Sequence, residues 1–264
     1  MKYFLIAGEA SGDLHARHLM DAIRNNDAGA EIRYWYRPDL AYMGFISVAM
    51  HLSEILRGMQ ECKKDILEFA PDRLILVDYP GFNLKIAAWF HKTFVEVQGG
   101  AASSAPKVVY YIPPKIWAWK EGRIVQIKKY VDSILSILPF EVNWYAEKHD
   151  CHVDYVGNPT LDEIVLFRTS LCPQDTEEWR RALRLDERPL VALLPGSRRQ
   201  EIERNLPMML RAARAVGGDY RYVIASAPNM EEDFYKRIIA SALGDDEDDF
   251  RSRVILAPCQ GSGS

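Results

Sequence analysis

The sequence predicts an α/β fold of two Rossmann-like lobes. Short apolar runs rich in β-branched residues alternate with segments whose apolar residues recur at helical spacing, as in parallel sheets flanked by helices. This alternation begins near residue 3, gives way to a polar and charged stretch at 168–189, and begins again at residue 190. We therefore expect an N-terminal lobe over 1–167, a linker over 168–189 and part of a C-terminal lobe over 190–264.

Composition narrows the classes of function. The 264 residues are 48% hydrophobic, enough to build real cores, and 33 Lys and Arg against 37 Asp and Glu give a formal charge of −4. No global basic character indicates nucleic acid. The four cysteines are scattered without a C-x-x-C pair, and no metal-ligand spacing appears. We expect a reduced, cytoplasmic setting, no metal and no cofactor. The apolar run at 3–7 is too short for a signal peptide, and no run reaches membrane-spanning length.

The first strand, at 3–7, leads into a glycine-containing turn and a helix. Ser11 or Asp13 would cap that helix in the simpler interpretation. Alternatively, glycine at 8 and at Gly12 lets a ligand approach the backbone at the helix start. Carboxylates in this turn oppose a bound phosphate, so sugar hydroxyls are the better ligand, with Ser11, Gly12 and Asp13 as candidate contacts.

A second strand is expected at 31–36, followed by an apolar segment at 40–50 and a helical pattern at 52–59. One interpretation is a buried helix. The other is an exposed apolar surface that holds acyl chains or dips into a bilayer. Met43 and Phe45 are the candidate lipid contacts, because methionine is soft and adaptable.

The strand expected at 73–77 ends at Asp78, where open α/β sheets place their chemistry. Asp78 is the candidate general base, which would take the proton from an attacking sugar hydroxyl. The alternative is an aspartate that caps a helix or braces a loop. Asn83 follows on the same segment and is a candidate acceptor contact.

A strand at 108–112 is stopped by two prolines and followed by a loop and a basic helix. This stretch interleaves indoles with cations, as suits an anionic ligand that has an apolar part. Core aromatics beside a solvated basic face are the alternative. The candidate acceptor contacts are Lys115, Trp117, Trp119, Lys120 and Arg123.

Helical spacing continues from Ile124 to Ile134, and a buried strand is expected at 135–140, closed by proline. A further strand near 153–156 ends before Asn158. The following proline holds Asn158 extended, so its amide either points at a ligand or braces the hinge between the lobes.

The second lobe begins with a strand at 190–194 and a turn at Gly196, Ser197 and Arg198. Close-approaching amides, a helix start and an adjacent arginine suit a diphosphate. Asn205 is expected to cap a fresh helix. In the linker, Asp175 is expected to cap a helix over 176–185. The remaining elements are expected as strands at 222–227 and 254–257 and a helix at 231–243.

Several of these stretches together resemble the lipid-A-disaccharide synthases, in the same order along the chain. The shared motifs, from residues 8, 78, 117, 138, 157 and 195, are G-E-x-S-G-D, D-x-P-x-F-N, W-A-W-[KR]-x-x-R, L-P-F-E, G-[NH]-P and P-G-S-R-x-x-E. The resemblance implies a two-lobed glycosyltransferase fold (GT-B). It also implies an inverting, metal-independent transfer of 2,3-diacylglucosamine from UDP-2,3-diacylglucosamine to the 6-hydroxyl of 2,3-diacylglucosamine 1-phosphate.

The resemblance also distributes roles. Asp78 matches the aspartate usually assigned to catalysis, and Arg198 with Gly196, Ser197 and Glu201 would bind the UDP diphosphate. Lys115, Lys120 and Arg123 would hold the acceptor phosphate, with Trp117, Trp119, Met43 and Phe45 along the acyl chains. The protein would sit peripherally at the cytoplasmic face of the inner membrane, and an oligomer is possible. The family's glycine-rich segment after the second strand is absent, and the family continues beyond the last residues here.

Two other classes of function stay open at this point. Another two-lobed UDP-sugar enzyme, such as an epimerase or a transferase of soluble sugars, would share the architecture but has no need of an apolar surface at Met43 and Phe45. A non-catalytic module that binds nucleotide sugars or lipids would bind ligand without turnover.

Overall fold

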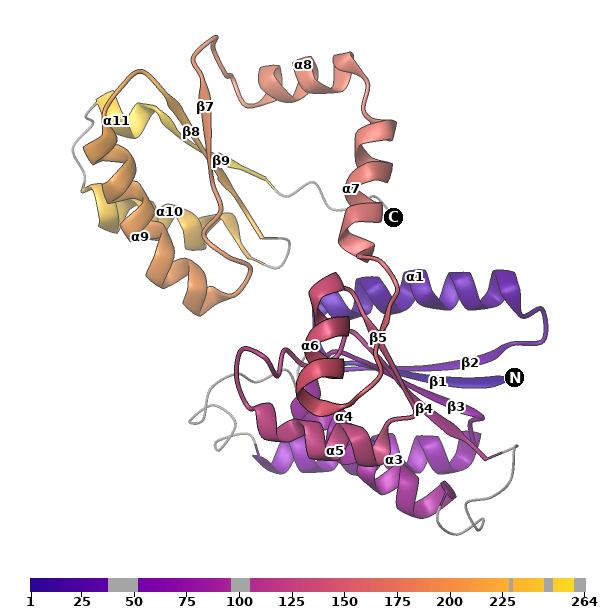
Figure 1. Ribbon diagram of the computed structural model, residues 1–264. Helices are drawn as coiled ribbons and strands as arrows, with labels where there is room; N and C mark the ends of the chain where they lie inside the picture. Colours follow the sequence, from indigo (N-terminus) through magenta and orange to yellow (C-terminus); the bar gives the residue numbers. More distant parts are fainter. Residues whose placement is uncertain (38–51, 96–104, 228–229, 245–248, 259–264) are drawn as a thin grey trace. The chain divides into compact units, whose positions relative to one another are not determined.

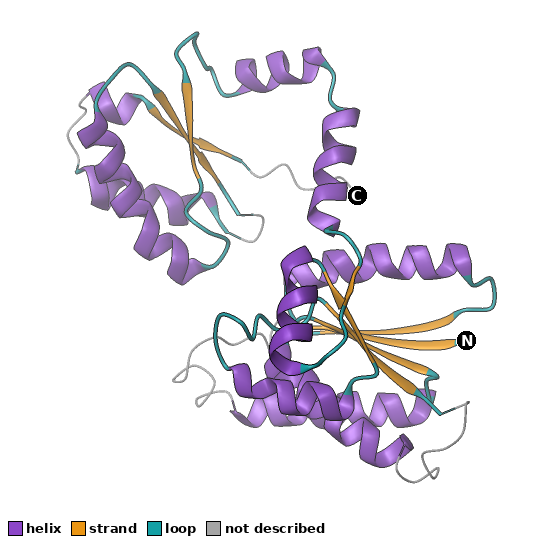
Figure 2. Cartoon of the chain, in the orientation of Figure 1, coloured by secondary structure: helices purple, strands orange, loops and turns teal. Residues whose placement is uncertain are grey.

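The computed structural model describes residues 1–37, 52–95, 105–227, 230–244 and 249–258. The predicted α/β class is confirmed, because every paired strand runs parallel to its neighbour and helices lie between the strands in sequence (Figures 1 and 2). The chain divides into two compact units, Met1–Val165 and Leu166–Ser264. Each unit has its own sheet and its own core.

The first unit is built on a parallel sheet whose spatial order is β2-β1-β3-β4-β5-β6. Its strands are β1 (Lys2–Ala7), β2 (Glu31–Tyr36), β3 (Arg73–Val77), β4 (Lys107–Tyr111), β5 (Ser133–Ser136) and β6 (Asp154–Tyr155). Strand β2 lies beside β1 on one side, and the chain then returns to place β3 on the other side of β1. The sheet therefore changes its direction of growth between β1 and β3, which is where open α/β sheets bind ligands.

Helices cover both faces of this sheet. On one face lies α1 (Ala10–Asn26), and on the other lie α3 (Leu52–Phe69), α4 (Pro80–Phe90), α5 (Ile124–Tyr130) and α6 (Pro139–His149) (Figure 1). The described residues of this unit also include a π-helical turn, η2 (His91–Val95), and a 3₁₀-helical turn, η3 (Glu121–Arg123). Alternation along β1 sorts its side chains: Phe4 and Ile6 join the core beneath α3 and α4, whereas Leu5 and Ala7 pack with α1.

Two expectations about this unit were wrong in their boundaries. The helix predicted to reach Ile134 ends at Tyr130, and Ile134 is a buried residue of β5. Its helical spacing was coincidental, because Ile134 and Ser136 follow the two-residue alternation of a strand. The strand predicted to reach residue 140 ends at Ser136, and Pro139 opens α6, where a missing N–H costs nothing.

The second unit has a smaller parallel sheet with the order β7-β8-β9. Its strands are β7 (Leu190–Leu193), β8 (Arg221–Ala225) and β9 (Val254–Ala257). Its helices are α8 (Pro173–Ala182), α9 (Arg199–Val216), α10 (Glu232–Leu243) and α11 (Asp249–Ser252). Helix α7 (Pro159–Ser170) crosses the boundary between the two units. Leu206 and Leu210 of α9 and Phe234 and Tyr235 of α10 are buried in one core against the sheet.

The helix caps predicted in this region were misplaced. Helix α8 begins at Pro173 with Cys172 as its N-cap, and Asp175 lies inside the first turn, where its carboxylate accepts the Cys172 amide at 2.7 Å. Helix α9 runs unbroken through Pro207. Asn205 caps no helix, because its side-chain amide donates to the carbonyl of Pro195 at 3.0 Å.

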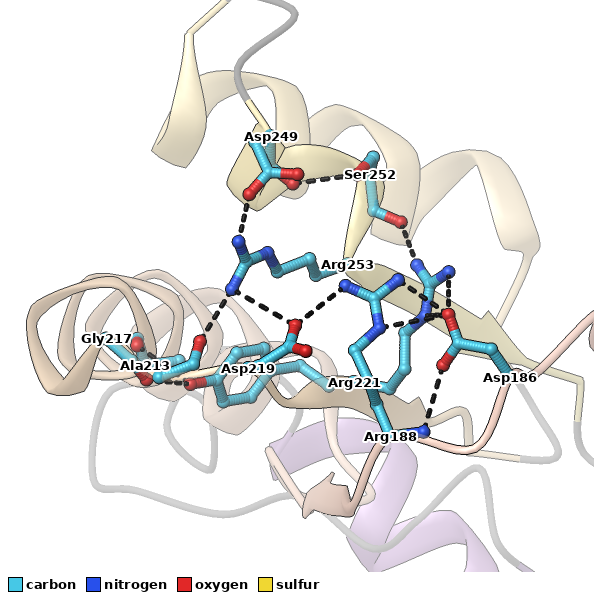
Figure 3. A network of polar contacts seen from close by, with 11 residues as sticks. Asp186, Arg188, Ala213, Gly217, Asp219, Arg221, Asp249, Ser252 and Arg253 are labelled. Carbon is cyan, nitrogen blue, oxygen red and sulfur yellow. Dashed lines mark hydrogen bonds and ion pairs between the residues drawn. The ribbon is translucent and has the colours of Figure 1, made fainter.

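A network of aspartates and arginines joins the segment before β7, which contains Asp186 and Arg188, to the amino ends of β8 and β9 (Figure 3). The carboxylate of Asp186 accepts hydrogen bonds from Arg188 and Arg221, with Oδ2 2.6 and 2.7 Å from their Nη2 atoms. Arg221 also donates to the carbonyl of Ser252, and Arg253 donates to the carbonyl of Gly218, each at 2.6 Å. The two arginines hold the pKa of Asp186 well below its usual range.

Candidate functional site

The ends of β1 and β3 meet at the point where the first sheet changes direction. Ala7 pairs with Val77, so Gly8 and Asp78 each follow the last pair of the ladder. A Cβ atom on Gly8 would lie 2.4 Å from Cδ1 of Tyr79, far inside contact distance. The glycine therefore lets the Tyr79 ring lie directly against the β1 turn, and the first and third strands present their following loops together.

The turn after β3 has an unusual backbone. Asp78 and Tyr79 both have positive φ, 47° and 48°, which is uncommon for residues with a side chain. Such strain persists only where surrounding contacts enforce it. Here the hydroxyl of Tyr110 and the side-chain amide of Asn83 both donate to the carbonyl of Asp78, at 2.8 and 2.7 Å. The Asp78 side chain is half-buried at this edge of the sheet.

Asn83 does not face the surface. Its side chain is fully buried, and its Nδ2 reaches the carbonyl of Val77 at 3.3 Å as well as that of Asp78. The acceptor contact expected at Asn83 therefore corresponds in the structure to an internal brace of the Asp78 turn. No sequence pattern indicated this role for Tyr110, the other brace, because a tyrosine in a strand is normally predicted to be a core residue.

The start of α1 differs from the expected capping. The helix begins at Ala10 with Glu9 as N-cap, and no side chain caps it, so neither Ser11 nor Asp13 has that role. The carboxylate of Asp13 accepts the Tyr34 hydroxyl at 2.7 Å and the Arg17 Nε at 3.0 Å. Ser11 is exposed and Gly12 is buried against β1. The exposed member of this predicted sugar-binding group is thus Ser11.

The loop after β4 places its indoles at the surface. Trp117 is 42% exposed and Trp119 is 61% exposed, which excludes core aromatics at these positions. The Lys120 ammonium lies 4.3 Å from the Trp119 ring centroid, and the Arg123 guanidinium lies 5.7 Å from it. An indole face flanked by cations can hold an anion that carries an apolar group.

Lys115 lies differently from the other cations of this loop. Its Nζ is 3.5 Å from Oε1 of Glu141, a carboxylate with no exposed surface. Trp117 donates its indole N–H to the same oxygen at 2.8 Å. Sequence reasoning gave Glu141 no role, although the residue closes the L-P-F-E motif.

Two further groups of expected residues lie elsewhere. Asn158 accepts the Thr160 amide on its Oδ1 at 3.1 Å, so it braces the first turn of α7. Met43 and Phe45 fall within 38–51, outside the residues that the structure describes.

In the second unit, the loop between β7 and α9 is organised by Glu201. Its Oε2 accepts the amides of Ser197 and Arg198 at 3.2 and 3.3 Å, and its Oε1 lies 2.9 Å from the Arg198 guanidinium. The hydrogen bond from the Arg198 guanidinium, and to a smaller extent that from the Ser197 amide, holds the pKa of Glu201 below its usual value. Gly196 has a φ of 124°, and a Cβ there would lie 2.7 Å from that of Glu201. The amides expected to meet a diphosphate therefore donate to a carboxylate in this structure.

Within the described parts of the chain, His, Cys, Asp and Glu form no cluster of three or more that could hold a metal ion. The helices described there include none that is long and apolar enough to cross a membrane.

Comparison with known families agrees with the motif resemblance. A family model described as lipid-A-disaccharide synthetase matches residues 3–250, most of the chain. The chain belongs to the lipid-A-disaccharide synthase family. A lipid-A-disaccharide synthase of Trichlorobacter lovleyi is 37% identical over 229 residues, covering 81% of this chain and 55% of the relative. One from Syntrophus aciditrophicus is 34% identical over 259 residues, covering 90% and 62%. The chain thus spans a little over half the length of these synthases.

Solved structures show the same fold at much lower identity. A UDP-GlcNAc 2-epimerase of Neisseria meningitidis, bound to UDP-GlcNAc, superposes with a TM-score of 0.61 at 10% identity, covering 98% of this chain and 73% of that one. A protein of Anabaena in complex with UDP-glucose gives 0.57 at 11% identity, covering 97% and 68%. These likenesses establish the architecture of this member of the synthase family and carry no inference about its substrate.

Proposed function

We propose that the protein is a lipid-A-disaccharide synthase. It would transfer 2,3-diacylglucosamine from UDP-2,3-diacylglucosamine to the 6-hydroxyl of 2,3-diacylglucosamine 1-phosphate, with inversion. The observation that carries the proposal is Asp78, on a braced, strained turn at the switch point of the first sheet, in a chain that the family model matches over 3–250.

The proposed chemistry divides between the two units. The Asp78 carboxylate accepts the proton of the acceptor 6-hydroxyl while that oxygen forms its bond to the anomeric carbon. The bond from the anomeric carbon to the diphosphate breaks, and its electron pair leaves with UDP. Arg198 compensates the charge on the departing diphosphate. The Ser197 amide can donate to the diphosphate only after the Glu201 carboxylate moves away, because that carboxylate accepts the Ser197 N–H at 3.2 Å in this structure.

The acceptor is proposed to lie at the basic aromatic loop, with its phosphate at Lys120 and Arg123 and its acyl chains toward Met43 and Phe45. Exposed apolar side chains support this placement, since Leu52 and Leu56 at the start of α3 are 48% and 49% exposed. They favour the exposed apolar surface over the buried helix. The proposal includes peripheral association with the cytoplasmic face of the inner membrane.

The test is UDP release by the full-length protein from UDP-2,3-diacylglucosamine, with and without 2,3-diacylglucosamine 1-phosphate. We expect release to need both lipids and to fall by at least about a hundredfold in Asp78→Asn. Asp72→Asn, at the other end of β3, is the matched control and should retain activity. Turnover without the phosphorylated acceptor would favour another UDP-sugar enzyme, and binding without turnover would favour a non-catalytic module.

A further inference from the structure

Glu141 is a buried carboxylate that joins separate segments of the first unit. It lies in the first turn of α6 and has no exposed surface. Its Oε1 accepts the indole N–H of Trp117 at 2.8 Å and lies 3.5 Å from the ammonium of Lys115. Its Oε2 accepts the hydroxyl of Ser136, a buried residue at the end of β5. Both carboxylate oxygens therefore have partners.

The partners of Glu141 explain why its burial is tolerated. A buried charge is costly unless it is paired and hydrogen-bonded, and removing one partner of such a pair is strongly destabilising. Ser136 fixes the carboxylate to the sheet, and Trp117 and Lys115 then attach the loop to the carboxylate. Trp117 and Lys115 thus both hold the loop at Oε1 of Glu141, although 42% of Trp117 and 61% of Trp119 are exposed.

Lys115 is also committed to this cluster. Its Nζ is buried and makes no hydrogen bond among the described residues, and its ionic partner there is Glu141. An acceptor phosphate at Lys115 would have to approach next to the Glu141 carboxylate, which repels it. The other two cations of the loop lie beside an indole ring: the charged groups of Lys120 and Arg123 are 4.3 and 5.7 Å from the ring centroid of Trp119.

We propose that Glu141 is a positioning residue that holds the basic aromatic loop in its binding conformation, with Lys115 as its buried counter-ion. Lys115 is then no ligand of the acceptor phosphate, which Lys120 and Arg123 receive. The loop's role toward the acceptor rests on the proposed function, whereas the anchoring does not.

The anchoring is tested on the chain as it stands by the indole N–H resonances of its 6 tryptophans. Trp117→Phe identifies the Trp117 signal. In Glu141→Leu we expect its exchange with solvent deuterium to accelerate about tenfold or more, because a hydrogen bond to a charged group is lost. Glu141→Gln keeps an acceptor for the indole N–H but removes the charge that pairs with Lys115, so its exchange rate should lie between those of the wild type and Glu141→Leu. Glu147→Leu, an exposed position on the same helix, is the control, and unchanged exchange in Glu141→Leu would overturn the proposal.

The role of Lys115 is tested in the full-length protein. Lys115→Met leaves the buried Glu141 carboxylate without its counter-ion, so activity and stability should fall together. Adding Glu141→Gln removes that unpaired charge and should restore the KM for the phosphorylated acceptor to within about threefold of wild type. If Lys115 were a phosphate ligand, the double variant would keep the raised KM of Lys115→Met. Absence of any UDP release in the wild type would count against the proposed function and leave the exchange result standing.

Discussion

The hydroxyl of Tyr110 donates a hydrogen bond of 2.8 Å to the backbone carbonyl of Asp78, from β4 to the turn after β3. Asn83 donates to the same carbonyl at 2.7 Å. Each residue at positive φ costs of order 1 kcal/mol or more, and this turn has two in succession at Asp78 and Tyr79. The position of the candidate base is therefore set by two buried side chains that donate to its own carbonyl.

Replacing Tyr110 with phenylalanine should weaken this brace without opening a cavity. The Asp78 carbonyl would keep its bond from Asn83, so we expect a loss of about 1 kcal/mol in the free energy of unfolding. Misplacement of the Asp78 carboxylate should lower kcat about tenfold or more, with little change in KM. Urea unfolding and initial rates of UDP release measure the two effects.

Tyr222→Phe is the matched control for that variant. Tyr222 is also buried, and its hydroxyl donates to the carbonyl of Ala213 at 3.0 Å in the second unit. It should lose similar stability and keep its kcat. Equal losses of kcat in both variants would mean that Tyr110 acts only on general stability.

The contact between Gly8 and Tyr79 gives a second prediction. In Gly8→Ala the new methyl would meet the Tyr79 ring at 2.4 Å, so the ring or the turn must move, at about 1–3 kcal/mol of stability. In Gly12→Ala the methyl would lie 3.5 Å from Cβ of Ala7, an ordinary contact, and a helical glycine gains about 0.5–1 kcal/mol from alanine. Thermal unfolding should separate them, and equal Tm values would contradict the packing described.

Hydrophobic patterning located most strands of both sheets, although it placed β5 at 135–140 in place of Ser133–Ser136. The apolar runs at 3–7, 73–77 and 190–194 each fall on a strand, because a parallel strand covered by helices must be apolar along its length. Helix boundaries were less certain. Ile134 fits both helical spacing and strand alternation, and only the pairing of β5 with β4 decides between them.

Individual side-chain roles depended on contacts that no local pattern contains. Asp13 has the residue type and position of a cap, but Tyr34 of β2 binds its carboxylate. Likewise, Trp117 and Glu141 are 24 residues apart in sequence and meet only through the folded sheet. Sequence could locate the edge of the sheet that carries the candidate site, and could not distinguish groups that face outward from groups that hold it in place.

A third prediction concerns the loop after β7. Gly196 and Gly217 both have positive φ, 124° and 65°, so alanine strains the backbone at either position. Only at Gly196 would the methyl also collide, with Glu201 at 2.7 Å, whereas nothing lies within 4 Å at Gly217. Gly196→Ala should therefore lose about 1–3 kcal/mol more than Gly217→Ala and should weaken UDP binding. Calorimetric titration with UDP and urea unfolding test this, and equal destabilisation would refute it.

The acid sensitivity of the second unit is the fourth prediction, and it concerns Asp186. Arg188 and Arg221 hold the pKa of Asp186 below its value in the unfolded chain, which is about 4. A depressed folded-state pKa stabilises the fold above the unfolded-state pKa, and this contribution is lost as pH falls through the folded-state value.

Asp186→Asn should therefore lower the stability of the second unit clearly at pH 7 and progressively less below about pH 4, where the wild type loses the same contribution. Asp233→Asn is the control, because the Asp233 carboxylate is 85% exposed and its ion pair with Lys236 is long, at 3.9 Å. Urea unfolding at each pH, with pulsed hydrogen exchange of peptides from β7 to β9, reports on the second unit alone. A difference in unfolding free energy between wild type and Asp186→Asn that stays constant from pH 7 to pH 3 would contradict this prediction. It would mean that the charge of the carboxylate contributes nothing and that its hydrogen bonds alone hold the strand ends together.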